Sequence, residues 1–158
     1  MLFGHTTEIA IRATAYLASQ PAGKLSPIHQ IARRAGLKRP LLAKVIARLT
    51  RARLLRTYRG PSGGVELARP ADGMCLWTVV QAMEGNKRTQ GCALGFHRCS
   101  AETPCRLHTR WSAIQEQIER LLEETTIASI AAPERGVAVD HVLPPEKKHS
   151  RSKRKLAL

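Results

Sequence analysis

The sequence predicts a mainly α-helical fold with a small β-hairpin wing: a winged helix-turn-helix followed by a long C-terminal dimerisation helix. Three observations lead to this prediction. Two short amphipathic segments flank the tight turn AGL at residues 35–37, which is typical of a helix-turn-helix. The stretch RGPSGG, residues 59–64, separates two strand-like segments as in a β-hairpin. A largely apolar stripe with heptad spacing starts at residue 107 and indicates a helix that pairs with another helix.

The N-terminal part of the chain predicts two helices with recognisable starts. Residues 6–19 are expected to form the first, because Thr6 or Thr7 can cap it and apolar residues recur at helical spacing. Ser26 followed by Pro27 predicts the start of the second helix, since a serine hydroxyl can cap free backbone amides and proline fits the first helical turn.

Shorter segments follow. A third helix is predicted from about residue 40 to residue 52, and strands are predicted at residues 54–58 and 65–69. Another short helix is expected within residues 68–85, where Cys75 is interpreted as a small buried apolar residue and not as a ligand. A hairpin directly after a helix-turn-helix is the wing of a winged helix.

The charge of the chain predicts its class of partner. A formal net charge of +14 and an isoelectric point near 10.7 favour nucleic acid over a basic surface that is merely solvated. No apolar stretch approaches the roughly 20 residues that span a bilayer, and the N-terminus lacks the apolar core of a signal peptide. We therefore expect a cytoplasmic protein with reduced thiols and no membrane partner.

The third predicted helix and the wing carry the residues expected to bind double-stranded DNA. Small side chains alternate with cations on the face that the apolar positions leave outside, which suits a groove flanked by phosphates. An ordinary solvated basic face is the alternative, and the hairpin that follows favours DNA. The predicted contacts are Ser26, Lys38, Arg39, Pro40, Ala43, Lys44, Arg48, Arg51, Arg59, Gly60 and Ser62, with Arg59 at the hairpin tip able to enter a minor groove.

The heptad stripe predicts how two copies of the chain associate. Its members step by four and three residues, and they are Leu107, Trp111, Ile114, Ile118, Leu121 and Thr125. One small domain seldom needs so long a narrow stripe for itself. We therefore expect a homodimer formed by a helix of about 22 residues, roughly 33 Å long. A helix folded back on its own domain is the alternative.

Three of the four cysteines fall in one loop. Residues 91–108 read GCALGFHRCSAETPCRLH, so that Cys92, Cys99 and Cys105 follow the pattern C-x6-C-x5-C and His108 comes three residues later. Clustered cysteines in a reducing compartment indicate metal or redox ligands rather than disulfides. Neither a zinc knuckle nor a ferredoxin run is present, whereas a flexible loop lets three thiolates close around an iron–sulfur cluster.

Several motifs, in this order, resemble one family. They are TTEIAIRATAYLA near the start, RGPSGG followed by LARPADG in the wing, VVQAMEG after it, and a cysteine loop that ends in CRLHTRW. Over residues 1 to about 130 the chain resembles the iron–sulfur winged-helix transcriptional regulators typified by IscR, NsrR and RirA. The resemblance implies homodimeric transcription factors, mostly repressors. In them each subunit holds a 2Fe–2S or 4Fe–4S cluster whose loss, oxidation or reaction with nitric oxide changes promoter occupancy.

The resemblance implies three cysteine ligands and one ligand of another type. His108 matches the position of the histidine ligand in the IscR branch. Glu8 lies where the NsrR branch places a carboxylate that reaches the cluster of the partner subunit. His97 is a weaker third candidate. Glu8 could instead suit the positive end of a helix dipole, and His108 could be a surface residue. The first cysteine gap has six residues where IscR-like members have five, which leaves the cluster type open.

The expected organisation has four parts. Residues 1–85 form the winged-helix DNA-binding domain, residues 86–106 the cysteine-rich cluster-binding loop, residues 107–131 the dimerisation helix and residues 132–158 a basic tail. A two-fold dimer of this kind is expected to read a pseudo-palindromic operator.

The expected function is that of a dimeric transcriptional regulator, a repressor, that senses redox state, nitric oxide or iron through its cluster. The alternative is a winged-helix regulator with a structural zinc ion, held by the three loop cysteines and His108, or with no metal. No enzymatic activity is expected, because Cys99 beside His97 has no further catalytic group around it.

Overall fold

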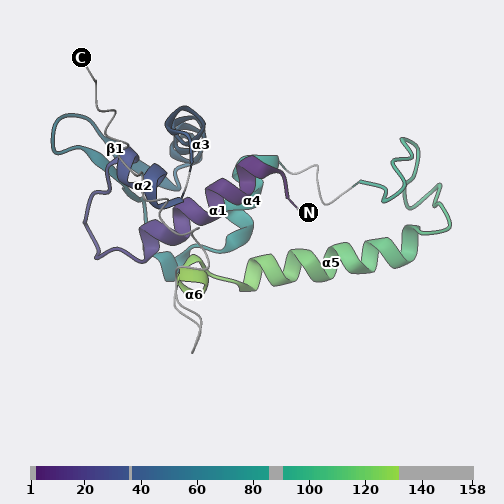
Figure 1. Ribbon diagram of the computed structural model, residues 1–158. Helices are drawn as coiled ribbons and strands as arrows, with labels where there is room; N and C mark the ends of the chain where they lie inside the picture. Colours follow the sequence, from purple (N-terminus) through teal and green to yellow (C-terminus); the bar gives the residue numbers. More distant parts are fainter. Residues whose placement is uncertain (1–2, 36, 86–90, 132–158) are drawn as a thin grey trace, which may run out of the picture.

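Six α-helices and one antiparallel hairpin make up the part of the chain that the computed structural model describes, residues 3–35, 37–85 and 91–131 (Figure 1). The predicted helix-turn-helix and wing are confirmed. In chain order the elements are α1 (His5–Ala18), α2 (Ile28–Ala35), α3 (Arg39–Arg51), β1 (Leu55–Tyr58), β2 (Gly64–Leu67), the 3-10 turn η1 (Ala71–Gly73), α4 (Leu76–Glu84), α5 (His108–Glu124) and α6 (Ile127–Ala131). The predicted tail, residues 132–158, lies outside the described residues.

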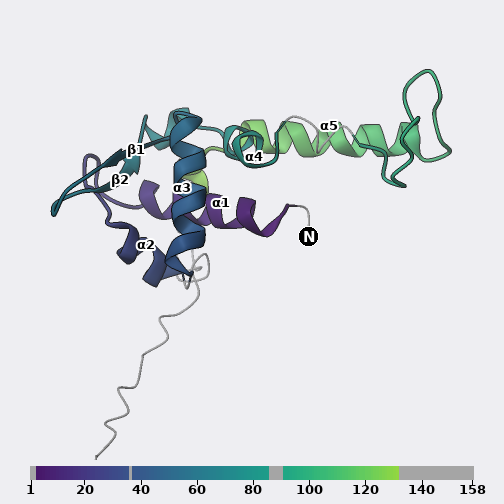
Figure 2. The same ribbon diagram turned by 90° about the horizontal axis from the view of Figure 1, so that it is seen from above.

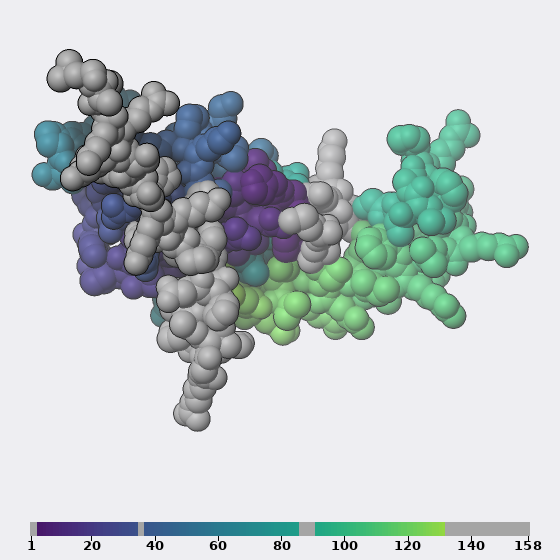
Figure 3. All heavy atoms as spheres, in the orientation of Figure 1, coloured from purple at the N-terminus to yellow at the C-terminus, as the bar shows by residue number. Residues whose placement is uncertain are grey.

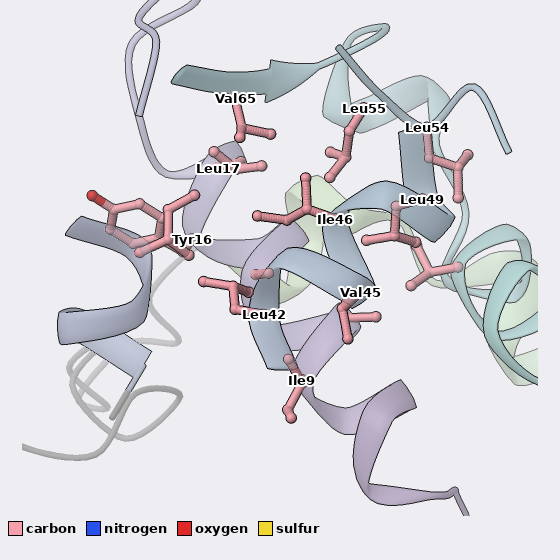
Figure 4. Packing of buried hydrophobic residues seen from close by; sticks show 14 of the residues in the cluster. Ile9, Tyr16, Leu17, Leu42, Val45, Ile46, Leu49, Leu54, Leu55 and Val65 are labelled. Carbon is pink, nitrogen blue, oxygen red and sulfur yellow. The ribbon is translucent and has the colours of Figure 1, made fainter. Parts of the chain in front are cut away.

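The core forms where α1, α3 and the hairpin meet. The predicted apolar face of α3 is confirmed, since Leu42, Val45, Ile46 and Leu49 are all buried. Figure 4 shows these side chains between α1 and the hairpin, among the other labelled residues of the cluster. Buried apolar groups on a helix recur every three or four residues, so one stripe of α3 enters the core and the opposite stripe stays in water.

The start of α1 is bound by a carboxylate from α4. Gly4, and not the predicted Thr6 or Thr7, is the N-cap residue of α1, and its N–H donates to Glu84 Oε1 over 3.0 Å. The fully buried Thr7 hydroxyl donates to the same oxygen. A negative group at the positive end of a helix is favourable, so Glu84 ties the last turn of α4 to the first turn of α1.

Ser26 corrects a second capping prediction. Its backbone pairs with β2 in an isolated bridge, in which Ser26 N and Val65 N each donate to the other residue's carbonyl over 3.0 Å. The side chain is fully buried, and among the described residues its hydroxyl has no hydrogen-bond partner. The prediction that this hydroxyl caps α2 is therefore wrong, because the pairing with the wing turns it inward.

The prediction of one continuous helix over residues 107–131 is also wrong, because the chain forms two helices there. α5 ends at Glu124, Thr125 is extended (φ −83°, ψ 117°), and α6 is a separate short helix. Thr125 O instead accepts Leu76 N over 2.7 Å, and Ile127 N donates to Met74 O over 2.8 Å. The fully buried Ile127 then enters the core.

α5 stands apart from the winged-helix core. At 17 residues it is about 26 Å long. Figures 1 and 2 show it running away from the core, with the cysteine loop at its far end. Within the described ranges, no helix is both long and apolar enough to cross a membrane.

The close contact between Gly64 of the wing and the backbone of Ser26 predicts that an added methyl group at Gly64 destabilises the fold. A Cβ on the buried Gly64 would lie 2.9–3.0 Å from backbone atoms of Ser26, which cannot move without breaking the bridge. We expect Gly64→Ala to lower the free energy of unfolding by about 1–3 kcal/mol in urea titrations. Gly73→Ala is the matched control, since nothing lies within 4 Å of its Cβ position. Equal stability of the two variants would contradict this packing.

Candidate functional site

The cysteine loop brings its three thiols together. The Sγ atoms of Cys92, Cys99 and Cys105 all lie within 4.8 Å of one another, and those of Cys92 and Cys105 are 3.7 Å apart. His108, in the first turn of α5, places Nδ1 3.3 Å from Cys99 Sγ. All four side chains are half-buried. The structure therefore gathers the three predicted cysteine sulfurs with the imidazole nitrogen of His108, one of the candidates for a fourth ligand.

Local hydrogen bonds shape the loop around the thiols. Gly95 has a positive φ of 71°, and its N–H donates to Cys92 O over 2.9 Å, closing a tight turn. The N–H of Cys99 donates to Phe96 O, and that of His108 donates to Cys105 O. Each cysteine thus lies in or next to a turn, which lets residues far apart in sequence face one point.

Two side chains of α5 bind the backbone of the cysteine loop just before Cys92. Trp111 Nε1 donates to Gly91 O over 2.8 Å, and Gln115 Nε2 donates to the same oxygen over 3.4 Å. Trp111, predicted as part of the dimer stripe, therefore also positions the residue just before Cys92. Figure 3 shows the loop and α5 standing out together from the rest of the molecule.

A cavity of about 260 Å³ lies between the loop and α5. The three cysteines, His108 and Trp111 line it, together with Glu116 and Glu119 on the next turns of α5. Sequence reasoning missed both glutamates. Their signal was helical spacing, because they follow His108 by eight and eleven residues and so share its face of the helix.

The thiols differ in acidity. Backbone N–H groups of Phe96 and Leu94 hold the pKa of Cys92 below its ordinary value. The backbone N–H of Cys105 lowers the pKa of Cys99, but burial and the neighbouring thiols of Cys105 and Cys92 raise it more, so that it lies above its ordinary value. Cys92 is therefore the first of these two thiols to ionise and to attract a cation.

The structure separates the candidates for a fourth ligand. His108 lines the thiol cavity, whereas Glu8 and His97 do not. Glu8 lies in the first turn of α1, 3.8 Å from His5 Nδ1, and Figure 1 shows that turn away from the cysteine loop of the same chain. Glu8 could reach thiols only in a second copy of the chain.

Most of the predicted DNA contacts are exposed. They are Lys38, Arg39, Pro40, Ala43, Lys44, Arg51, Arg59, Gly60 and Ser62. A groove of about 610 Å³ runs between α3, the start of α2 and the hairpin, lined by Ala43 and Arg59 among others.

Sequence reasoning missed several other groups along this groove. Thr50 of α3 and His29 of α2 line it, and so does Tyr58, whose hydroxyl donates to Glu66 Oε1 over 2.8 Å. That hydrogen bond raises the pKa of Tyr58 above its ordinary value. Its signal was its place in the sequence, because Tyr58 directly precedes Arg59, the predicted contact at the hairpin tip.

Two predicted DNA contacts are placed elsewhere. Ser26 is fully buried under the wing, so the prediction that its side chain meets DNA is wrong. Arg48 lies on the edge of α3 next to α4, where its Nε donates to Ala82 O over 2.8 Å. The side chain is exposed, and this bond directs the guanidinium toward α4.

The predicted dimer stripe is largely exposed. Leu107, Ile114 and Leu121 are 39%, 46% and 63% exposed, and their spacing of seven residues places them on one face. Ile118 and Thr125 are half-buried. A row of exposed large apolar side chains is typical of a surface that another protein surface covers.

The chain is similar in sequence to a known family and to a known protein. The Rrf2 family model, described as "Iron-dependent Transcriptional regulator", matches residues 3–133. A protein of Aquifex aeolicus (strain VF5), named "Putative HTH-type transcriptional regulator", is 32% identical over 132 residues, covering 82% of this chain and 91% of that one.

Solved structures share the fold. CymR (YrzC), the global cysteine regulator of B. subtilis, has a TM-score of 0.68 at 19% identity, covering 82% of this chain and 95% of that one. T. potens IscR has a TM-score of 0.64 at 24% identity, covering 81% and 84% respectively. At these identities the likeness concerns the fold alone.

The convergence of the thiols predicts a cadmium titration. Cd²⁺ added to the reduced, metal-free protein should give a thiolate charge-transfer band from three sulfurs. We expect Cys92→Ser, Cys99→Ser and Cys105→Ser each to lose about one third of that band. Cys75→Ser is the control, because Cys75 lies at the start of α4, outside the thiol cluster, and should leave the band unchanged. A smaller band in this control, or full bands in the loop variants, would contradict a three-thiol site.

Proposed function

The chain belongs to the Rrf2 family of transcriptional regulators, and from that premise we propose that it is a dimeric DNA-binding regulator controlled by an iron–sulfur cluster. The family model and the relatives describe regulators and not enzymes, in line with the expectation from the sequence. The signal would be redox state, nitric oxide or iron, and the regulator would act as a repressor.

One observation carries the cluster proposal. Three thiols within 4.8 Å of one another, with the imidazole of His108 beside Cys99, face a cavity of about 260 Å³. Thiolates are the usual ligands of iron–sulfur clusters, and imidazole replaces them in some. These residues therefore fit such a group, which would supply iron that exchanges electrons and reacts with oxidants or nitric oxide.

The chain's own residues would then have separate tasks. Cys92, Cys99 and Cys105 would hold the group, with His108 or Glu8 of the partner subunit as the remaining ligand. Trp111 would keep the loop entrance against α5. A cluster bound by these residues can favour one arrangement of the cysteine loop and α5 over another. Loss of the cluster would then shift the population between the two arrangements.

The exposed stripe of α5 supports the proposed dimer. Two such helices would bury Leu107, Ile114 and Leu121 against each other, with Trp111, Ile118 and Thr125 beside them. The two α3 helices would then meet half-sites about one DNA turn apart, as in a pseudo-palindromic operator.

A regulator with a structural zinc ion is the second candidate, and the distance between two of the sulfur atoms supports it. The 3.7 Å between Cys92 Sγ and Cys105 Sγ is close to the roughly 3.8 Å edge of a tetrahedron with Zn–S bonds of about 2.3 Å. Cys₃His is a familiar structural zinc site. A regulator without metal is the third candidate, since the fold is shared with CymR, the global cysteine regulator of B. subtilis.

Metal analysis after anaerobic purification tests the proposal. We expect iron and sulfide in the parent chain and in Cys75→Ala, and neither in Cys99→Ala, because Cys99 is one of the three converging thiols. Zinc without sulfide would support the second candidate. A parent chain with neither metal, purified without oxygen, would contradict both.

The wing makes a separate prediction about DNA. Arg59→Ala should weaken binding to a duplex that the parent selects from a random pool by about 1 kcal/mol, roughly fivefold. The salt dependence of the binding constant should flatten, because one cation fewer meets the DNA. Arg69→Ala is the control, since Arg69 is also exposed but does not line the groove between α3 and hairpin. Unchanged affinity of Arg59→Ala at physiological salt would remove the wing from the interface.

A further inference from the structure

Arg48 joins the DNA-facing helix to a neighbouring helix. We propose that Arg48 is a positioning residue, which makes the placement of α3 depend on α4 and, through α4, on α5 and the cysteine loop. The inference rests on the proposed function, because it names how the thiol site reaches the DNA-binding helix. It gives Arg48 a different role from the phosphate contact that the charge pattern suggested.

The contact between Arg48 and α4 has a clear physical cause. Ala82 lies in the last turn of α4, where backbone carbonyls have no partner inside the helix. Arg48 Nε donates to Ala82 O over 2.8 Å, across 34 residues of sequence. A guanidinium also suits the negative end of a helix, and its planar fork fixes the direction of the bond.

The start of α4 is tied to the end of α5. Leu76 N donates to Thr125 O over 2.7 Å, and Ile127 N donates to Met74 O over 2.8 Å. Cys75 and Thr126 pair between these two bonds as an isolated bridge. α4 and α5 also pack against each other. A shift of α5 relative to the core therefore moves α4.

The start of α5 is tied to the thiols. Trp111 and Gln115 hold Gly91 O, and His108 Nδ1 lies 3.3 Å from Cys99 Sγ. A continuous set of hydrogen bonds thus runs from the cysteine loop through α5 and α4 to Arg48. Figure 2 shows the same order in space, with α4 between α5 and α3.

The last turn of α4 also holds α1. Glu84 accepts hydrogen bonds from Gly4 N and from the Thr7 hydroxyl, two residues after the carbonyl that Arg48 binds. The last turn of α4 is therefore bonded to α1 through Glu84 and to α3 through Arg48. A shift of α4 relative to α1 would reach α3 through the Arg48 bond.

A salt-dependence experiment separates a tether from a phosphate contact. Arg51→Ala is the matched control, since Arg51 is an exposed arginine one turn further along α3. Binding to the selected duplex is measured over a range of salt for the metal-loaded chain and in the Cys99→Ala background. Arg51→Ala should lower the slope of log K against log salt by about 1 and keep the ratio between the two backgrounds.

Arg48→Ala should do the opposite. We expect an unchanged salt slope, a severalfold smaller affinity ratio between the loaded chain and the Cys99→Ala background, and faster hydrogen exchange of α3 amides in the free protein. Arg48→Lys, which keeps a donor and a charge, should restore part of that ratio. A slope lowered as in Arg51→Ala, with the ratio and the exchange unchanged, would show a phosphate contact and overturn the proposal.

Failure of the proposed function would look different. In that case the parent chain and Cys99→Ala would bind the duplex equally, before Arg48 is changed. The salt slope and the exchange of α3 amides would still decide the role of Arg48: unchanged slope with faster exchange supports the tether, and a lowered slope with unchanged exchange rejects it.

Discussion

The pairing between the start of α4 and the turn after α5 is the constraint on which the arrangement depends. Leu76 and Met74 on one side bind Thr125 and Ile127 on the other through two backbone hydrogen bonds. These bonds end α5, return the chain to the core and bury Ile127 there completely. As a consequence α5 is fixed to the core at its C-terminal end, and it carries the cysteine loop away from the winged helix.

Local sequence signals predicted most of the fold. The apolar period of α3 and the RGPSGG turn gave helix and wing, because both depend on residues close in sequence. The break at Thr125 was missed, since the heptad stripe continues through it while its carbonyl pairs with a residue 49 positions earlier. The prediction that Ser26 caps α2 was wrong for the same reason. Its capping signal is local, whereas its backbone pairs with Val65, 39 residues later in the sequence, which the local pattern cannot show.

The candidate site divides along the same line. The cysteine spacing predicted that the three thiols could converge. His108 lies beside them because one backbone turn joins it to Cys105, and its Nδ1 is 3.3 Å from Cys99 Sγ. The charge pattern of α3 could not separate Arg48 from Arg51, since a cation that binds a helix end and one that faces phosphate look alike in sequence. Only the position of Ala82 O distinguishes them.

The separation of tasks along the chain has a genetic consequence. The thiols lie in the loop, the exposed cations predicted to meet DNA lie on α3 and the hairpin, and the exposed apolar stripe lies on α5. A chain that loses a loop cysteine keeps the surface for pairing with an intact chain. In a cell that makes equal amounts of both, mixed pairs of the proposed dimer would outnumber intact ones, so the defective allele would be dominant wherever activity needs two intact thiol sites in one pair. An allele that loses the α5 stripe would be recessive, because its product could not enter the pair.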